Sequence, residues 1–78
     1  IKYPVIAQEN GIQGRVVCSF VVNRDGSIVD IQVMRGVDPS LDKEAIRVIS
    51  EMPKWKPGEQ RGKPVRVRFI LPVQFRLQ

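Results

Sequence analysis

Few side chains in this sequence could carry out chemistry. The chain has no histidine, which removes the commonest general base and metal ligand. Its single cysteine, Cys18, shares one face of an alternating segment with Val16 and Phe20 and has no histidine to activate it. We therefore interpret it as a small buried hydrophobic residue. One cysteine forms no internal disulfide and cannot anchor a zinc site. It fits a reducing compartment and a periplasmic protein equally well.

Three acids, Asp38, Asp42 and Glu44, could suggest paired carboxylates for acid–base catalysis. They fall where a helix is expected to begin, so roles in capping and in opposing the helix dipole explain them more simply. Gly58 and Gly62 do not form a phosphate-binding loop, because no glycine-rich turn leads from a strand into a helix. The sequence therefore predicts no enzyme, no cofactor and no metal site.

The remaining candidate chemistry is electrostatic. The net charge is +5, and much of the excess lies in the last third of the chain. The basic residues there are Lys54, Lys56, Arg61, Lys63, Arg66, Arg68 and Arg76. A basic surface favours an acidic partner, an anionic membrane surface or nucleic acid, although it can also be no more than a solvated face.

Nucleic-acid binding would require aromatic rings exposed beside the basic residues. Phe69 and Phe75 instead share their face with Val67, Leu71 and Val73, which is typical of a core face. We therefore expect no nucleic-acid partner, and a basic nucleic-acid-binding module is a distant third among the functions considered.

The elements that position these residues follow from hydrophobic periodicity. Pro4 and Gly11 bound a short helix over residues 4–10. Alternation of period two predicts a strand from Gly14 to Val22 and a second strand over 28–35. The segment 23–26 between them contains Asp-Gly and predicts a tight turn. In the second strand, residues 29, 31 and 33 are expected to share the apolar face. Asp38 or Ser40 caps a helix with an apolar stripe that Pro53 stops.

After the helix, the sequence predicts a polar loop over 59–63 and then one long alternating strand. One face of this strand holds Val65, Val67, Phe69, Leu71, Val73, Phe75 and Leu77, and the other holds Arg66, Arg68, Ile70, Pro72, Gln74 and Arg76. The predicted fold is α+β: a three-stranded antiparallel sheet with one helix packed on a face and a short N-terminal helix.

If the first strand is central, the last strand lies on an edge. A long edge strand offers unpaired backbone groups that can accept another strand, a binding mode called β-augmentation. Pro72 and the arginines could equally protect that edge, and architecture alone does not separate the two possibilities. The lone Trp55, between two lysines and two prolines, is expected to pack over the helix–sheet seam as a structural clamp.

Several motifs together resemble the C-terminal domain of TonB. They are Tyr3-Pro4, the pattern G-x-V-x-x-x-F-x-V over residues 14–22, Asp25-Gly26, L-D-x-E-A from Leu41, the stretch PKWKPG over 53–58, G-x-P-V from Gly62 and F-x-L-P-x-x-F from Phe69. The forms L-D-x-E-A and W-K-P-G are most similar to the energy transducers of Bacteroidetes-type Gram-negative bacteria. The resemblance covers nearly the whole chain.

The resemblance implies that residues 1–78 are one domain of a longer periplasmic protein, anchored in the inner membrane by a helix upstream of a Pro-rich spacer. The sequence begins without Met and contains no apolar run of the roughly 20 residues that span a bilayer, which agrees with a fragment. The family works with ExbB and ExbD, which draw on the proton gradient. Its C-terminal domain binds the TonB box, a short extended peptide of outer-membrane receptors, and transmits force that drives import.

Carried over to this sequence, the docking strand that pairs with the TonB box is Arg66, Val67, Arg68, Phe69, Ile70, Leu71, Pro72, Val73, Gln74 and Phe75, with Arg66 to Leu71 as its firm part. Tyr3 and Pro4 pack near the receptor contact in the family. An unpaired edge also allows a homodimer through strand exchange. The alternative function is a TonB-like domain of a membrane-bound sensor or scaffold, and the sequence upstream of Ile1 would discriminate between the two.

Overall fold

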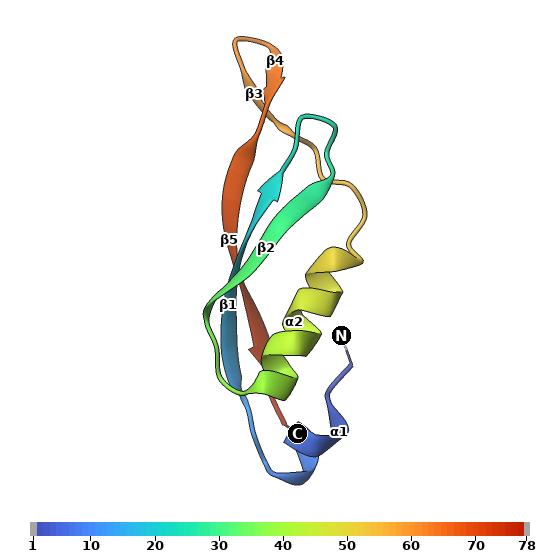
Figure 1. The fold of residues 1–78 in the computed structure, drawn as a ribbon, viewed down its shortest axis with the longest axis vertical. Coiled ribbons are helices and arrows are strands. Elements are labelled where there is room, and N and C mark those ends of the chain that lie inside the picture. Colours follow the sequence, from blue (N-terminus) through green and yellow to red (C-terminus); the bar gives the residue numbers. More distant parts are fainter. Residues whose placement is uncertain (1, 78) are drawn as a thin grey trace.

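The computed structural model describes residues 2–77 of an elongated chain, about 49 × 20 × 19 Å (Figure 1). The elements, in chain order, are α1 (Val5–Glu9), β1 (Gly14–Val22), β2 (Ile28–Arg35), α2 (Pro39–Ser50), β3 (Gly58–Gln60), β4 (Lys63–Val65) and β5 (Val67–Phe75). None of the described helices is both long and apolar enough to span a membrane.

Strands β2, β1 and β5 form one antiparallel sheet in that order, with β1 at its centre. Helix α2 packs beside the sheet (Figure 1), and α1 lies at the end of the molecule where β1 begins. The core is the layer between sheet and helix, formed by Val16, Cys18, Phe20, Val22, Leu41, Ala45, Ile49, Val73 and Phe75 together with Ala7. The predicted α+β fold is confirmed, and Cys18 is buried as expected.

Helix α2 begins where its capping residues predict. Asp38 is the N-cap, its carboxylate accepts from the backbone N–H of Ser40, and Pro39 occupies the first turn. Of the two caps that the sequence allowed, Asp38 is therefore the one used. Leu41, Ala45 and Ile49 form the buried stripe of the helix.

The predicted alternation along β2 is wrong at Val29. Two register irregularities interrupt the β1–β2 pairing, and Asp30 adopts a positive φ of 51°. The extra residue moves the following side chains to the opposite face. Val29 consequently pairs with Val21 on the face away from the core, whereas Ile31 and Val33 pack against the core.

The loop predicted at 59–63 is also wrong, because β3 and β4 form a second small hairpin there. Its turn residues, Arg61 and Gly62, both have positive φ, 54° and 76°. Such two-residue turns favour Asn-Gly, so the sequence Arg-Gly did not indicate a hairpin turn. A left-handed conformation costs a residue other than glycine about 1–2 kcal/mol. The last strand accordingly divides into β4 and β5 at Arg66.

Trp55 packs between the two long strands at this end of the sheet. Its ring is half-buried, edge-on to Phe20 at 5.2 Å and tilted against Phe69 at 5.3 Å between ring centroids. Its backbone N–H donates to the carbonyl of Gly26 at 2.9 Å. Trp55 therefore fastens the segment after α2 to the turn between β1 and β2.

Candidate partner-binding edge

Strand β5 has one paired edge and one open edge. Its pairing with β1 runs without irregularity from Val67 opposite Val22 to Phe75 opposite Gly14. Among residues 2–77, no strand pairs with its other edge. The backbone N–H and C=O groups that point to that side are available to another strand.

The other outer strand of the sheet, β2, is a poorer template for pairing. Its two irregularities and the left-handed Asp30 interrupt the regular spacing of backbone groups, and bulges are a common means of protecting an edge. Helix α2 also lies beside β2 (Figure 1). The two edges therefore differ, and β5 is the one suited to accept a strand.

The two faces of β5 have the character that the sequence predicted. On the core side, Val73 and Phe75 are buried, while Phe69 and Leu71 are only half-buried. On the other side, every alternate residue from Arg66 to Gln74 is exposed, and Ile70 is 67% exposed. A peptide added to β5 would place its side chains alternately beside an apolar row and beside this exposed row.

Pro72 lies within β5 opposite Val17 and does not interrupt the pairing with β1. It has no N–H, so the strand has one donor fewer at this position. The predicted strand residues from Arg66 to Phe75 are thus brought together in one ladder, except that Arg66 itself lies at the junction between β4 and β5.

Tyr3 lies at the C-terminal end of this strand. Its ring is edge-on to Phe75 with 5.7 Å between centroids, and its hydroxyl donates to the carbonyl of Ile12. Pro4 is the residue before α1 and borders a separate hollow of about 350 Å³ over α2. The structure therefore joins Tyr3 to the predicted strand, while Pro4 faces α2.

Arg68 makes a contact that sequence reasoning missed. Its Nη1 donates to the hydroxyl of Ser19 at 3.0 Å, and its Nη2 donates to the carboxylate of Asp30. Ser19 is only 2% exposed. The hydrogen bond from Arg68, followed by one from Gln32, holds the pKa of Asp30 below its usual value. The alternation placed Arg68 and Ser19 on one face, but the position of Asp30 depends on the irregularity in β2.

A second ion-pair group lies on α2, away from the edge. Arg47 binds Glu44 through two hydrogen bonds of 2.8 and 2.7 Å and also contacts Glu51. The bonds from Arg47, assisted by the backbone N–H of Lys2, lower the pKa of Glu44 to about 2. These contacts tie the N-terminal segment to α2. Residues 2–77 contain no group of acids, histidines and cysteines that could hold a metal ion.

These features define a small α+β domain with a long, open, C-terminal edge strand. The chain belongs to the family described as the Gram-negative bacterial TonB protein C-terminal, whose model matches residues 1–77. The family assignment that the sequence motifs indicated is thereby confirmed.

Relatives from three bacteria are consistent with this assignment. The chain is 30% identical to the protein TonB of Vibrio cholerae over 78 residues, which is 99% of this chain and 32% of that protein. It is 41% identical to the protein TonB of Pseudomonas aeruginosa over 54 residues, 69% of this chain and 15% of that protein. It is 50% identical to the protein TonB of Helicobacter pylori over 34 residues, 44% of this chain and 12% of that protein. The chain thus spans at most about a third of these relatives.

The fold is also similar to a solved structure. An NMR solution structure of the Helicobacter pylori TonB C-terminal domain superimposes with a TM-score of 0.71 at 32% sequence identity. The alignment covers 99% of this chain and 69% of that chain.

Proposed function

We propose that this chain is the receptor-binding domain of a TonB-type energy transducer. In this proposal the TonB box of an outer-membrane receptor adds a strand to the open edge of β5. The observation that carries the proposal is the contrast between the two outer strands: β5 is regular and open, whereas β2 is irregular. Backbone hydrogen bonds then supply affinity, and the alternating rows of side chains supply selectivity.

The fold suits the transmission of force. The N-terminal segment contacts the C-terminal end of β5 through Tyr3 and Phe75, so a pull on that segment would enter the sheet at this end of the strand. A peptide paired along β5 would be loaded in shear, with its backbone hydrogen bonds sharing the load. The continuous ladder between β5 and β1 and the buried Phe20 and Phe75 resist separation of the strand from the domain.

The rest of the transducer is part of the same proposal. It comprises an inner-membrane helix, a periplasmic spacer and coupling to ExbB and ExbD, which deliver energy from the proton gradient. The domain itself then acts as a binding module in the periplasm and not as an enzyme.

Backbone methylation of the peptide tests strand pairing without altering the protein. In a β-strand, alternate N–H groups point to opposite sides, so only every second amide of a TonB-box peptide would face β5. One peptide carries N-methyl groups on the odd amides and a second on the even amides. We expect one of them to lose binding and the other to retain it, measured by fluorescence anisotropy. Equal affinities of both methylated peptides would contradict strand pairing.

A further inference from the structure

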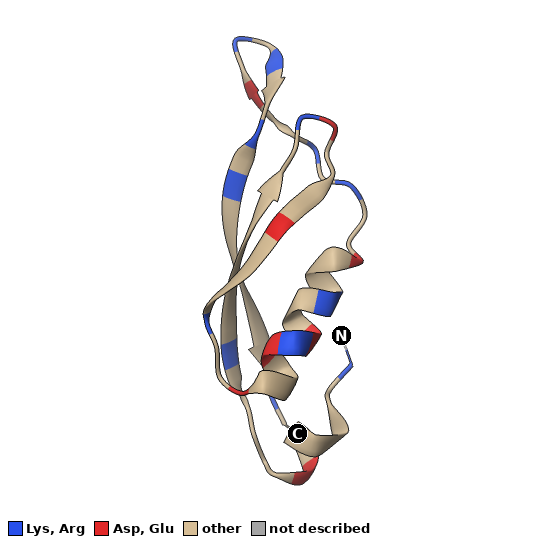
Figure 2. Cartoon of the chain, in the orientation of Figure 1, with Lys and Arg blue, Asp and Glu red and all other residues tan. Residues whose placement is uncertain are grey.

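The net positive charge of the protein is concentrated at one end. Three segments meet there: the turn between β1 and β2, the segment after α2, and the β3–β4 hairpin with the start of β5 (Figure 2). We call their basic residues the basic pole, which consists of Arg24, Lys54, Lys56, Arg61, Lys63 and Arg66. Residues 23–27 and 54–66, which hold the whole pole, contain two acids, Asp25 and Glu59, and therefore carry a net charge of +4.

No residue of the basic pole forms an ion pair within the described chain, although the charge of Lys54 helps to lower the pKa of Asp25 and that of Arg66 helps to lower the pKa of Asp30. The ion pairs among residues 2–77 are those of Arg47 with Glu44 and Glu51 and that of Arg68 with Asp30. Asp25, the acid next to Arg24, accepts hydrogen bonds from the backbone and hydroxyl of Ser27 at 2.9 and 2.6 Å. The six side chains of the pole thus lack ion-pair partners among the described residues, whereas Arg47 of α2 and Arg68 of β5 have them.

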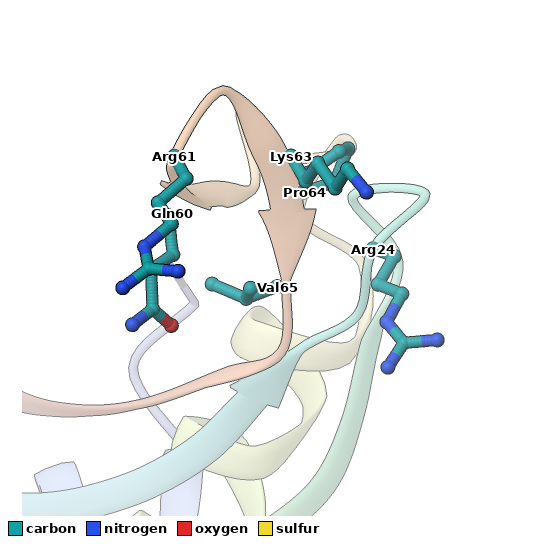
Figure 3. Close-up of a pocket in the computed structure, with 6 residues that line it drawn as sticks. All are labelled: Arg24, Gln60, Arg61, Lys63, Pro64 and Val65. Carbon is teal, nitrogen blue, oxygen red and sulfur yellow. The ribbon is translucent and has the colours of Figure 1, made fainter.

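Three residues of the pole border an open hollow of about 600 Å³ on the surface. Its lining combines three cations, Arg24, Arg61 and Lys63, with Gln60, Pro64 and Val65. Figure 3 shows Gln60 on one arm of the hairpin with Arg61 next to it at the turn, and Val65 extending from the other arm toward them. Arg24 lies on the neighbouring turn, with its guanidinium directed away from the hairpin. Arginine fits carboxylates bidentately, and the apolar Pro64 and Val65 can contact the aliphatic part of a side chain. This combination fits the side chains of an acidic peptide.

Arg61 occupies a backbone position that disfavours it. Its φ of 54° lies in the left-handed region, in a turn where Asn or Gly would be unstrained. Strain of this kind gathers at functional sites. The side chain of Arg61 lies beside Gln60 at the rim of the hollow (Figure 3).

We propose that the basic pole binds an acidic segment of the receptor that adjoins the TonB box. This inference rests on the proposed function and names the chemistry of the neighbouring partner surface. Strand β4 continues through Arg66 into β5, so a peptide paired with β5 that extends beyond Val67 reaches the pole directly. Because a strand advances about 3.3 Å per residue, a few acidic residues next to the pairing segment suffice.

Extended peptides test the inference. A labelled TonB-box peptide is prepared with three glutamates at its N-terminus, with three at its C-terminus, and with glutamines in the same places. We expect one of the glutamate peptides, the one whose extension runs toward Val67, to bind about tenfold more tightly at low salt than its glutamine counterpart. The gain disappears at high salt, because exposed charges are screened.

Two protein variants of equal net charge distinguish an effect of the pole from an effect of the protein's overall positive charge. In the first variant three residues of the pole are replaced: Arg24→Gln, Arg61→Asn and Lys63→Gln. We expect it to lose the gain in affinity from the glutamates and to keep its affinity for the unextended peptide. The control Arg35→Gln/Lys43→Gln/Arg76→Gln removes three exposed charges elsewhere and keeps the gain. If both variants lose the gain equally, or if the wild-type protein shows none, the inference is wrong.

The remaining outcomes are also distinguishable. Binding of the unextended peptide without any benefit from glutamates would leave the proposed function standing and refute the inference. Failure of the unextended peptide to bind would refute the proposed function and the inference with it. Binding of the pole to phosphatidylglycerol vesicles, without a glutamate effect, would assign the pole to a membrane surface and overturn the inference.

Discussion

Arg68 of β5 reaches across the central strand to the carboxylate of Asp30 on β2, and on the way its guanidinium donates to the hydroxyl of Ser19 on β1. One side chain thus connects all three strands on the face of the sheet that α2 does not cover. Arg68 belongs to the predicted docking strand, and its side chain also stabilises the sheet from which the open edge extends.

Replacing Arg68 by alanine should lower the free energy of unfolding by about 1–2 kcal/mol, because the buried hydroxyl of Ser19 loses its partner. Asp30→Asn should cost less, since Asp30 is exposed. Urea denaturation measures both, and Arg66→Ala, an exposed arginine near the start of the same strand, serves as the control with little expected change. Equal stabilities of the Arg68 and Arg66 variants would show that the bridge contributes nothing.

Trp55→Ala should lower the free energy of unfolding by about 2–3 kcal/mol, somewhat less than the loss of a fully buried Trp, because the ring is half-buried against Phe20 and Phe69. Trp55→Phe should recover part of that loss. Denaturant titration measures both variants. Unchanged stability together with lost peptide binding would make Trp55 a partner contact instead of a structural clamp.

Arg61→Asn should raise the free energy of unfolding by about 0.5–1 kcal/mol, since asparagine tolerates the left-handed conformation of this turn better. The control is Lys63→Asn, which also removes one positive charge but at a residue without a left-handed backbone. Thermal unfolding of the two variants then measures the effect of the backbone conformation apart from that of the charge. If Arg61→Asn is no more stable than Lys63→Asn, the left-handed backbone of Arg61 is not strained.

Acid should weaken the attachment of the N-terminal segment to α2. The pKa of Glu44 is lowered from 4.5 to about 2 by Arg47, so its contribution to stability is complete above pH 4.5 and is lost as pH falls toward 2. Glu44→Gln should remove this loss of stability in acid. At neutral pH it should lower the free energy of unfolding by less than about 1 kcal/mol. Unfolding measured from pH 6 to 2 tests this, with exposed Glu59→Gln as the control. Parallel curves for wild type and Glu44→Gln would contradict it.

The sequence predicted the faces and the edge position of the last strand because both depend on strict alternation and on a turn containing Asp-Gly. It did not predict the side on which Val29 lies, because the irregularity at Asp30 breaks the alternation on which the prediction relied. The contact of Arg68 with Asp30 depends on that same irregularity. The β3–β4 hairpin was missed because Arg61 occupies a turn position that normally signals itself through Asn or Gly.

The candidate site was predicted less completely than the fold. Periodicity located the open strand, and the resemblance to the family added Tyr3, which the structure places against Phe75. The sequence showed a basic excess that includes five of the six residues of the basic pole, but it could not predict that Arg24 lies beside them. Their meeting depends on the bond between Trp55 and Gly26 and on the hairpin.

The central claim is that a receptor peptide pairs with the open edge of β5. Its most direct test is an NMR titration of the ¹⁵N-labelled domain with a TonB-box peptide. We predict amide shifts that follow Arg66 to Phe75 and reach Tyr3, with β2 and the exposed side of α2 unchanged. Shifts confined to α2 or to β2, with β5 silent, would contradict the account.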